Sequence, residues 1–240
     1  MKKIAIIIPT YNETENIIEL IRKIRNYVRN VIIYIVDDSP TPEIGKLINP
    51  NLKNVKYFYR KNKKGRGSAV LFGIKKALKD KQINLVIEMD ADFSHNPNEL
   101  KKNISFFKKK NLDMLIASRY LNSSKILNWS LPRKIFSFFS NKVARFFLNI
   151  NIKDFTNGFR FYSIRSAKKI INKCGNIGDG FIILSEILVE LYYNKFMVSE
   201  TSSIFRNRVR GESSVNFNEI IKSFIGLIKI YRIKTKLCRK

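Results

Sequence analysis

The sequence predicts an α/β fold with a mainly parallel central sheet flanked by helices. Over residues 1–120, short β-branched apolar runs alternate with segments of helical spacing, which is typical of such sheets. Polar or acidic residues directly follow several of these runs. Ligands of parallel α/β sheets bind beyond the carboxyl ends of the strands, so these residues predict the site. With 240 residues, 45% of them apolar, the chain is long enough for one large domain with a substantial core.

Each element of the first half follows from its own pattern. Continuous apolar runs predict strands buried on both faces, and apolar residues three and four apart predict helices. Pro97 is well placed in the first turn of one of these helices. The predicted strands are residues 3–9, 31–36, 55–59, 85–89 and 114–117, and the predicted helices are residues 13–27, 67–78 and 97–109.

From residue 131 onward the chain becomes richer in aromatic and basic residues. Residues 133–150 combine five phenylalanines with interleaved Lys and Arg. Such a helix either packs into the core or lies in a membrane interface with its rings toward lipid, and we expect the interfacial arrangement. The remaining predicted elements are a strand at 159–162, helices at 166–173 and 184–193, a strand at 196–205 and a basic amphipathic tail at 217–234.

The charge is strongly basic, with 46 Lys and Arg against 19 Asp and Glu, a formal net charge of +27. This excess favours an anionic partner: a nucleic acid, an anionic membrane or a phosphorylated substrate. It does not choose among them, because a composition rich in Lys, Ile and Asn also places many lysines on an ordinary solvated surface.

The two cysteines, Cys174 and Cys238, are far apart and belong to no CxxC pair. They indicate neither a disulfide framework nor a zinc site, and we expect reduced thiols in a cytosolic compartment. No leader is visible after Met1, and no run reaches the roughly 18 uncharged apolar residues that span a bilayer. We therefore expect the protein to meet a membrane only at its surface.

Two acidic pairs follow predicted strands and carry the chemistry. Asp90 and Asp92, with Ala91 between them, can hold a hard divalent cation together with substrate phosphates. Asp37 and Asp38 follow another strand, where a carboxylate can bind ribose or a base edge. Either pair could instead be turn or helix-capping residues. No phosphate-binding P-loop and no full dinucleotide fingerprint occurs, which disfavours hydride transfer.

Six segments in this order resemble the family 2 glycosyltransferases with the GT-A fold, and within them the dolichol-phosphate mannose synthase branch. The resemblance runs from Ile4 to about Phe217. The segments are residues 8–13 (IPTYNE), 36–40 (VDDSP), 89–95 (MDADFSH), 118–120 (SRY), 154–160 (DFTNGFR) and 208–214 (RVRGESS).

The resemblance implies a role for each matching residue. The nucleoside pocket would be lined by Pro9, Tyr11, Glu13, Val36 and Asp38. Asp90, Ala91 and Asp92 would meet the diphosphate, with a divalent cation (Mg or Mn) held by Asp92, Asp90 and Ser94. Arg119 and Arg208 would contact phosphates or the donor sugar, and Arg133 would help to receive the acceptor phosphate. Because the donor and acceptor anions must be held close and in line, we expect Arg119 and Arg133 to do this.

The chain departs from the family pattern at two positions. Ser214 stands where the late motif has Lys, which removes one expected cation near the phosphates. Thr41 and Pro42 lie where the family has a later Asp. His95, the only histidine, is expected to be a turn residue and not a base.

Together these observations predict an inverting, metal-dependent glycosyltransferase that moves a hexose, mannose from GDP-mannose, onto a dolichyl or polyprenyl phosphate. The expected organisation is a catalytic domain at 1–217 and a basic amphipathic C-terminal helix at 218–240. We expect it at the cytoplasmic face of a membrane, with a membrane-anchoring subunit as a further possible partner and no nucleic acid. The alternatives are a UDP-glucose or other UDP-sugar enzyme, a basic nucleic-acid-binding protein and an inactive partner subunit.

Overall fold

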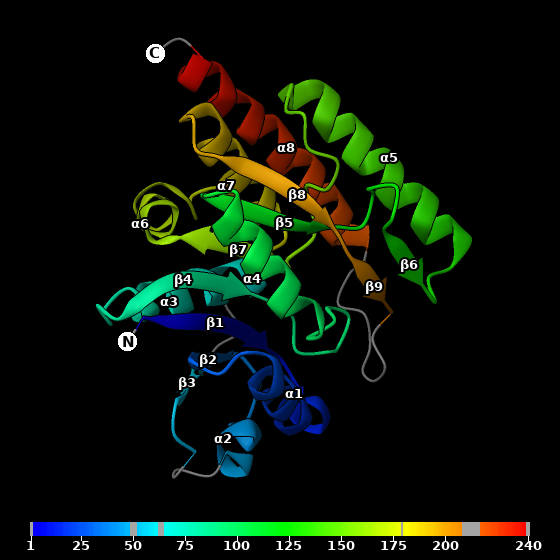
Figure 1. The fold of residues 1–240 in the computed structure, drawn as a ribbon. Helices are drawn as coiled ribbons and strands as arrows, with labels where there is room; N and C mark the ends of the chain where they lie inside the picture. The colour runs from blue at the N-terminus through cyan, green and yellow to red at the C-terminus, as the bar shows by residue number, and fades with distance from the viewer. Residues whose placement is uncertain (1, 49–51, 62–64, 179, 208–216, 239–240) are drawn as a thin grey trace.

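The computed structural model describes residues 2–48, 52–61, 65–178, 180–207 and 217–238. These form a seven-stranded sheet with helices on both faces and a separate two-stranded sheet (Figure 1). The strands are β1 (Lys3–Thr10), β2 (Val31–Asp37), β3 (Val55–Tyr59), β4 (Ile83–Glu88), β5 (Met114–Ser118), β6 (Lys125–Leu127), β7 (Arg160–Ser163), β8 (Val198–Ser202) and β9 (Ile204–Arg206). The helices are α1 (Thr14–Tyr27), α2 (Glu43–Leu47), α3 (Arg66–Ala77), α4 (Glu99–Lys109), α5 (Leu131–Leu148), α6 (Ile164–Lys173), α7 (Ile182–Tyr193) and α8 (Phe217–Cys238).

The large sheet has the strand order β3-β2-β1-β4-β7-β5-β8. Neighbouring strands are parallel except that β7 is antiparallel to both β4 and β5. The carboxyl ends of β1, β2 and β4 therefore meet at one edge of the sheet. β6 pairs in parallel with β9, and Figure 1 shows this pair on the side toward which the arrow of β1 points.

Strand β1 shows how the sheet divides the core into two layers. Ile4, Ile6 and Ile8 pack on one face with the buried apolar side chains of α1 and α4. Ala5 and Ile7 point to the other face, which α3, α6 and α7 cover. The strand alternation of period two thus assigns each residue to a layer, and both layers are apolar because both faces are buried.

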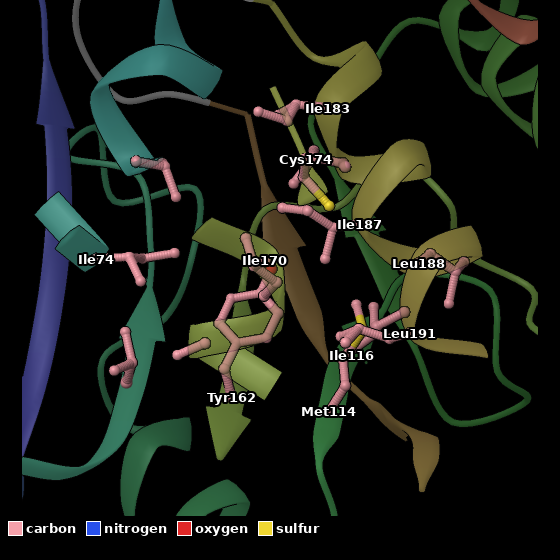
Figure 2. Packing of buried hydrophobic residues seen from close by; sticks show 14 of the residues in the cluster. Ile74, Met114, Ile116, Tyr162, Ile170, Cys174, Ile183, Ile187, Leu188 and Leu191 are labelled. Atoms are coloured by element: carbon pink, nitrogen blue, oxygen red, sulfur yellow. The ribbon is translucent and has the colours of Figure 1, made fainter. Parts of the chain in front are cut away.

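The layer beneath α6 and α7 is closed by side chains from distant parts of the chain. Figure 2 shows Tyr162 of β7 and Met114 of β5 among Ile170, Ile187 and other apolar side chains of the two helices. All of these side chains are essentially inaccessible to solvent. The second half of the chain therefore completes the core that the first half begins.

Helix α5 exposes its large apolar side chains to solvent. Its buried residues are Asn141, Ala144 and Leu148, whereas all five of its phenylalanines are at least half exposed. Helix α8 packs against α7 and lies beside α5 (Figure 1), and its Ile230 is fully buried. The C-terminal helix is thereby fastened to the domain. No helix among the described residues is both long and apolar enough to cross a bilayer.

The predicted α/β fold is confirmed, with helix and strand bounds displaced by a few residues. Two short elements, α2 and β6, were not predicted because each lacks a periodic apolar pattern of useful length. The predicted strand at 196–205 is divided: Glu99 of α4 accepts the Ser203 hydroxyl at 2.6 Å and the Ile204 amide at 2.8 Å. These two bonds turn the chain between β8 and β9.

Candidate active site

The acidic turn after β2 is closed by protein partners. Asp37 is fully buried, and its carboxylate accepts hydrogen bonds from the Thr10 hydroxyl at 3.1 Å and the Tyr57 hydroxyl at 2.7 Å. The Ser39 amide and hydroxyl also donate to Asp37. Burial and the bond to Asp37 raise the pKa of Tyr57 well above its ordinary value, so this phenol remains a donor. Asp37 thus holds the ends of β1, β2 and β3 together.

Asp38 of the same turn lies in a buried ion pair. The Arg60 guanidinium donates from Nε and Nη2 to the two carboxylate oxygens, each at 2.5 Å. Arg60 also donates to the Ser68 hydroxyl at 2.8 Å, which ties this pair to α3. A fork of this kind fixes both side chains at the strand edge.

The acidic turn after β4 is organised by His95. The Asp90 amide donates to His95 Nδ1 at 2.9 Å, so Nδ1 carries no proton and Nε2 must donate to Asn157 Oδ1 at 2.8 Å. Burial lowers the pKa of His95, although Asp90 and Asp92 oppose this effect. The ring is almost fully buried and is stacked on Phe159. His95 is therefore a neutral structural residue of the turn, and no acid–base role is assigned to it.

Within that turn Asp92 and Ser94 face one another across a short bend. Asp92 Oδ1 accepts the Ser94 amide at 3.0 Å, and the intervening Phe93 has a φ of 60°. Both Asp92 and Ser94 are buried, and the Ser94 hydroxyl has no hydrogen-bond partner within the described part of the chain. A buried hydroxyl and a carboxylate two residues apart in one turn are oxygen groups of the kind that a hard cation binds.

Asp90 is held from the opposite side of the sheet edge by α3. Arg66, the first residue of that helix, donates from Nε to Asp90 Oδ1 at 2.8 Å. The approach requires Gly158, because a Cβ atom there would lie 1.9 Å from Arg66 Nη2. Glu88 ends β4, two residues before Asp90. Burial raises the pKa of Glu88, whereas the Arg66 charge acts to lower it. The Tyr162 hydroxyl donates a hydrogen bond to Glu88 at 3.2 Å.

Arg119 is buried and paired with Asp154. Its Nε and Nη2 atoms donate to the two carboxylate oxygens at 2.8 and 2.7 Å, and its amide donates to the same carboxylate at 2.9 Å. Burial alone would raise the pKa of Asp154, but Arg119 and its hydrogen bonds outweigh burial and hold it below the ordinary value. The structure thus presents Arg119 as part of a fixed pair.

Arg133 lies in the first turn of α5, beside β9. Its guanidinium carbon is 4.2 Å from the ring centre of Trp129, and Nη1 donates to Asn207 Oδ1 at 3.3 Å. The amide of the preceding residue, Arg206, donates to the Ser94 carbonyl at 3.2 Å. The β9 end therefore joins the α5 arginine to the turn that carries Asp92.

The other residues predicted for the donor pocket are distributed unevenly. Tyr11 is 42% exposed and Pro9 is half-buried at the end of β1, whereas Val36 and Ala91 are buried and their side chains present no surface. Glu13 is the N-cap residue of α1, and its carboxylate accepts a hydrogen bond from the Asn16 side-chain Nδ2 at 2.8 Å. Arg208 and the late motif at 208–214 lie outside the described residues.

Several residues of the site were not predicted. Arg60, Arg66 and Trp129 stand outside the recognisable motifs, and each contacts a residue distant in sequence. The DFTNGFR segment was identified, but the pairing of Asp154 with Arg119 was not. No sequence signal distinguishes Arg60 and Arg66 from the rest of the 46 Lys and Arg residues.

The metal prediction is compatible with this chemistry but has no complete site of protein ligands. Among the described residues, no group of three or more His, Cys, Asp or Glu side chains is placed to hold a metal ion. Asp92 and the unpartnered Ser94 hydroxyl fit a cation that takes its other ligands from substrate phosphates, as Mg²⁺ commonly does.

The mixed α/β sheet with two acidic turns at one edge fits the fold class of glycosyltransferases, and residues 5–171 match the family model for glycosyl transferase family 2. The chain belongs to this family. It is 36% identical over 237 residues to a "Dolichol-phosphate mannosyltransferase" of Pyrococcus furiosus, covering 96% of this chain and 63% of that protein. It is 30% identical over 223 residues to a "Polyprenol monophosphomannose synthase" of Mycolicibacterium smegmatis, covering 91% of this chain and 83% of that protein.

Solved structures share the fold at low sequence identity. Glucosyl-3-phosphoglycerate synthase from Mycobacterium tuberculosis, solved with Mn²⁺, UDP and glucosyl-3-phosphoglycerate, has a TM-score of 0.63 at 12% identity, covering 97% of this chain and 80% of that one. S. aureus TarS 1–349 with UDP has a TM-score of 0.65 at 18% identity, covering 97% and 65%. These similarities confirm the GT-A type fold. At this level of identity they do not indicate which substrate this chain uses.

Proposed function

We propose that the protein transfers mannose from GDP-mannose to a polyprenyl or dolichyl phosphate, with inversion at the anomeric carbon. The observation that carries this proposal is the 36% identity, over 96% of the chain, to the Pyrococcus dolichol-phosphate mannosyltransferase. The chain spans 63% of the length of that relative. The polyprenol mannose synthase supports the same sugar and class of acceptor.

In the proposed reaction a phosphate oxygen of the acceptor attacks the anomeric carbon. A new C–O bond forms as the bond to the diphosphate breaks, and the electron pair leaves with GDP. The acceptor oxygen is already anionic near neutral pH, so no general base is needed, in agreement with the neutral, enclosed His95. The protein contributes position and charge, because two anions must be held close and in line.

We assign the acceptor phosphate to Arg133 and to the buried Arg119–Asp154 pair, and Arg208 to the donor phosphates. Pro9, Tyr11, Glu13 and Asp38, with main-chain atoms near Val36, would receive the nucleoside. Asp90, Ala91 and Asp92 would face the diphosphate, with Asp92, Asp90 and Ser94 as the oxygen ligands of a cation. When bound, a divalent cation supplies Lewis-acid neutralisation of the leaving diphosphate.

The acceptor is a lipid, and α5 supplies a surface for it. Five phenylalanines of this helix are at least half exposed, with Phe146 at 81%, and Lys142 and Arg145 are interleaved. An interfacial helix buries its aromatic rings among the lipid chains and places its Lys and Arg side chains near the lipid phosphates. We propose that this face contacts the cytoplasmic side of a membrane; Cys174 and Cys238, both free thiols, support a reducing compartment.

A transfer assay tests the proposed reaction. Purified protein with a polyprenyl phosphate and Mg²⁺ or Mn²⁺ is given labelled GDP-mannose or, separately, labelled UDP-glucose. Label entering the lipid phase from GDP-mannose alone is the expected result. Label from UDP-glucose alone would overturn the donor and establish the UDP-sugar alternative. Transfer from neither would leave an inactive partner subunit as the better account.

Vesicle co-sedimentation tests the membrane face. Phe146→Glu should lower partitioning onto anionic vesicles about 10-fold, because a Phe side chain loses roughly 1.5–3 kcal/mol on leaving the apolar phase. Ile18→Glu is the matched control, since Ile18 is also exposed but lies on α1. Equal losses in both variants would contradict the assignment. Wild-type protein that binds no vesicle would point to a membrane-anchoring subunit.

A further inference from the structure

Trp129, the only tryptophan of the chain, lies in the segment between β6 and α5. Its ring is close to two arginines, Arg119 and Arg133. The guanidinium carbon of Arg133 is 4.2 Å from its ring centre and that of Arg119 is 5.6 Å away. Phe205 of β9 meets the indole edge to face, with ring centres 5.3 Å apart. Trp129 thus contacts both arginines assigned to the acceptor phosphate, although neither is its chain neighbour.

Aromatic rings surround Arg119 in addition to its ion pair with Asp154. Its guanidinium carbon is 5.4 Å from the ring centres of both Tyr120 and Phe205, while Asp154 holds its polar edge. Aromatic faces attract cations without neutralising them, and indole does so most strongly. The contact with Trp129 therefore helps to fix the position of Arg133 and leaves its positive charge in place.

The indole also has an unused donor. Trp129 Nε1 is buried and, within the described residues, has no hydrogen-bond partner. A buried tryptophan N–H normally finds an acceptor, because leaving it unpaired forfeits the hydration it had in water. An anionic oxygen held by Arg133 would supply that acceptor.

We infer that Trp129 is a positioning residue for the acceptor phosphate: its ring holds Arg133 and Arg119 in place, and its Nε1–H donates to an oxygen of the phosphate. The inference rests on the proposed function and adds a contact to it. The competing account is simple packing of an aromatic residue between β6 and α5. That account predicts a structural role with no response to ligand.

The fluorescence of the protein tests this directly, since all tryptophan emission comes from Trp129. Wild-type protein is titrated with farnesyl phosphate, farnesol, inorganic phosphate and GDP-mannose in separate experiments. We expect a saturable change with farnesyl phosphate and none with farnesol. Arg133→Ala should raise the midpoint about 10-fold, since a charge-assisted bond contributes roughly 1.5–3 kcal/mol.

Two variants separate the ring from its N–H. Trp129→Phe keeps a weaker aromatic face and removes the donor; it should raise the acceptor KM about 3- to 10-fold and leave donor KM and kcat close to wild type. Trp129→Ala removes both and should raise the acceptor KM by about 10-fold or more. The conservative Phe variant keeps the test valid if the Ala variant does not fold.

The outcomes distinguish this inference from the proposed function. Wild-type protein that transfers mannose while its emission ignores farnesyl phosphate, together with a wild-type acceptor KM in Trp129→Phe, overturns the role of Trp129 alone. Absence of both transfer and any emission change overturns the proposed function, and this inference with it. A response to inorganic phosphate equal to that of farnesyl phosphate would reduce the site to a general anion site and overturn the acceptor assignment.

Discussion

The two acidic turns at the sheet edge look alike in sequence but differ in structure. After β2, Asp37 accepts from Thr10, Ser39 and Tyr57 and is fully buried. After β4, the Asp90 side chain pairs with Arg66 and is 24% exposed, and Asp92 lies in the same turn as the Ser94 hydroxyl, which has no partner in the described chain. In the first turn the Asp37 carboxylate links neighbouring strands. In the second turn the oxygen atoms of Asp90, Asp92 and Ser94 lie where a ligand is proposed to bind.

The difference teaches that position at a strand end is not sufficient for a catalytic role. An acid surrounded by donors from its own protein contributes to stability, and its removal should be seen in unfolding. Removal of an acid from the turn where the substrate is proposed to bind should be seen in activity. The experiments below test this division, beginning with the largest expected effect.

Asp92→Asn should lower turnover about 10³-fold, because the charge that offsets the leaving diphosphate is lost. The free energy of unfolding should change by less than about 0.5 kcal/mol, since the Asn carbonyl can still accept the Ser94 amide. Turnover is measured in the mannose transfer assay and stability by urea denaturation.

The matched control is Asp80→Asn. Asp80 accepts the Gln82 amide at 2.9 Å in the same two-residue geometry, but it precedes β4 instead of following it. This variant should keep full turnover. An Asp92→Asn enzyme within 10-fold of wild type would remove Asp92 from the reaction.

Asp154→Asn should lower the free energy of unfolding by about 3 kcal/mol at pH 7, because it leaves the buried Arg119 charge uncompensated. The pKa of Asp154 is below its ordinary value, so the ionised form stabilises the fold above about pH 4, and this stabilisation is lost as the pH falls through the lowered pKa. The deficit of the variant should therefore shrink at acidic pH.

Urea denaturation at pH 7 and pH 3 measures this difference. Glu19→Gln serves as the control, because Glu19 and Lys23 form an exposed pair on α1 whose loss should cost less than about 1 kcal/mol at either pH. A deficit in Asp154→Asn that is independent of pH would show that packing, not charge, is responsible.

Asp37→Ala should lower the free energy of unfolding by about 2–3 kcal/mol, since four hydrogen-bond donors from Thr10, Ser39 and Tyr57 lose their acceptor. Tyr57→Phe, which removes one of those donors, should cost about 1 kcal/mol. Urea denaturation compares the two. If the Asp37→Ala protein were as stable as wild type, the claim that the turn after β2 serves stability would be wrong.

Ser94→Ala should give the smallest effect, a rise of about 3-fold in the metal concentration at half-maximal activity, equivalent to about 0.6 kcal/mol. Its stability should not fall, because the buried hydroxyl has no partner to lose within the described residues. Metal titration of the transfer assay measures this shift. A titration curve that superimposes on wild type would exclude Ser94 from cation binding.

The sequence predicted what short-range patterns determine. β1, β2, β4 and β5 are continuous apolar runs, and the acids that end β2 and β4 were placed at the correct edge. It did not predict which of those acids would be enclosed, because Tyr57 and Arg60 reach them from another strand and its following loop. Trp129 was likewise not predicted, because the role inferred for it depends on its contacts with Arg119 and Phe205, which are distant in sequence.

The antiparallel strand β7 also sets a constraint on how the protein is made. β7 lies between β4 and β5, yet its residues leave the ribosome only after both neighbours and the whole of α5 have emerged. Until then β4 and β5 each present an open strand edge, which is the feature most prone to pairing with other chains. Slow synthesis before residue 163 would prolong this interval and with it the exposure of the two strand edges.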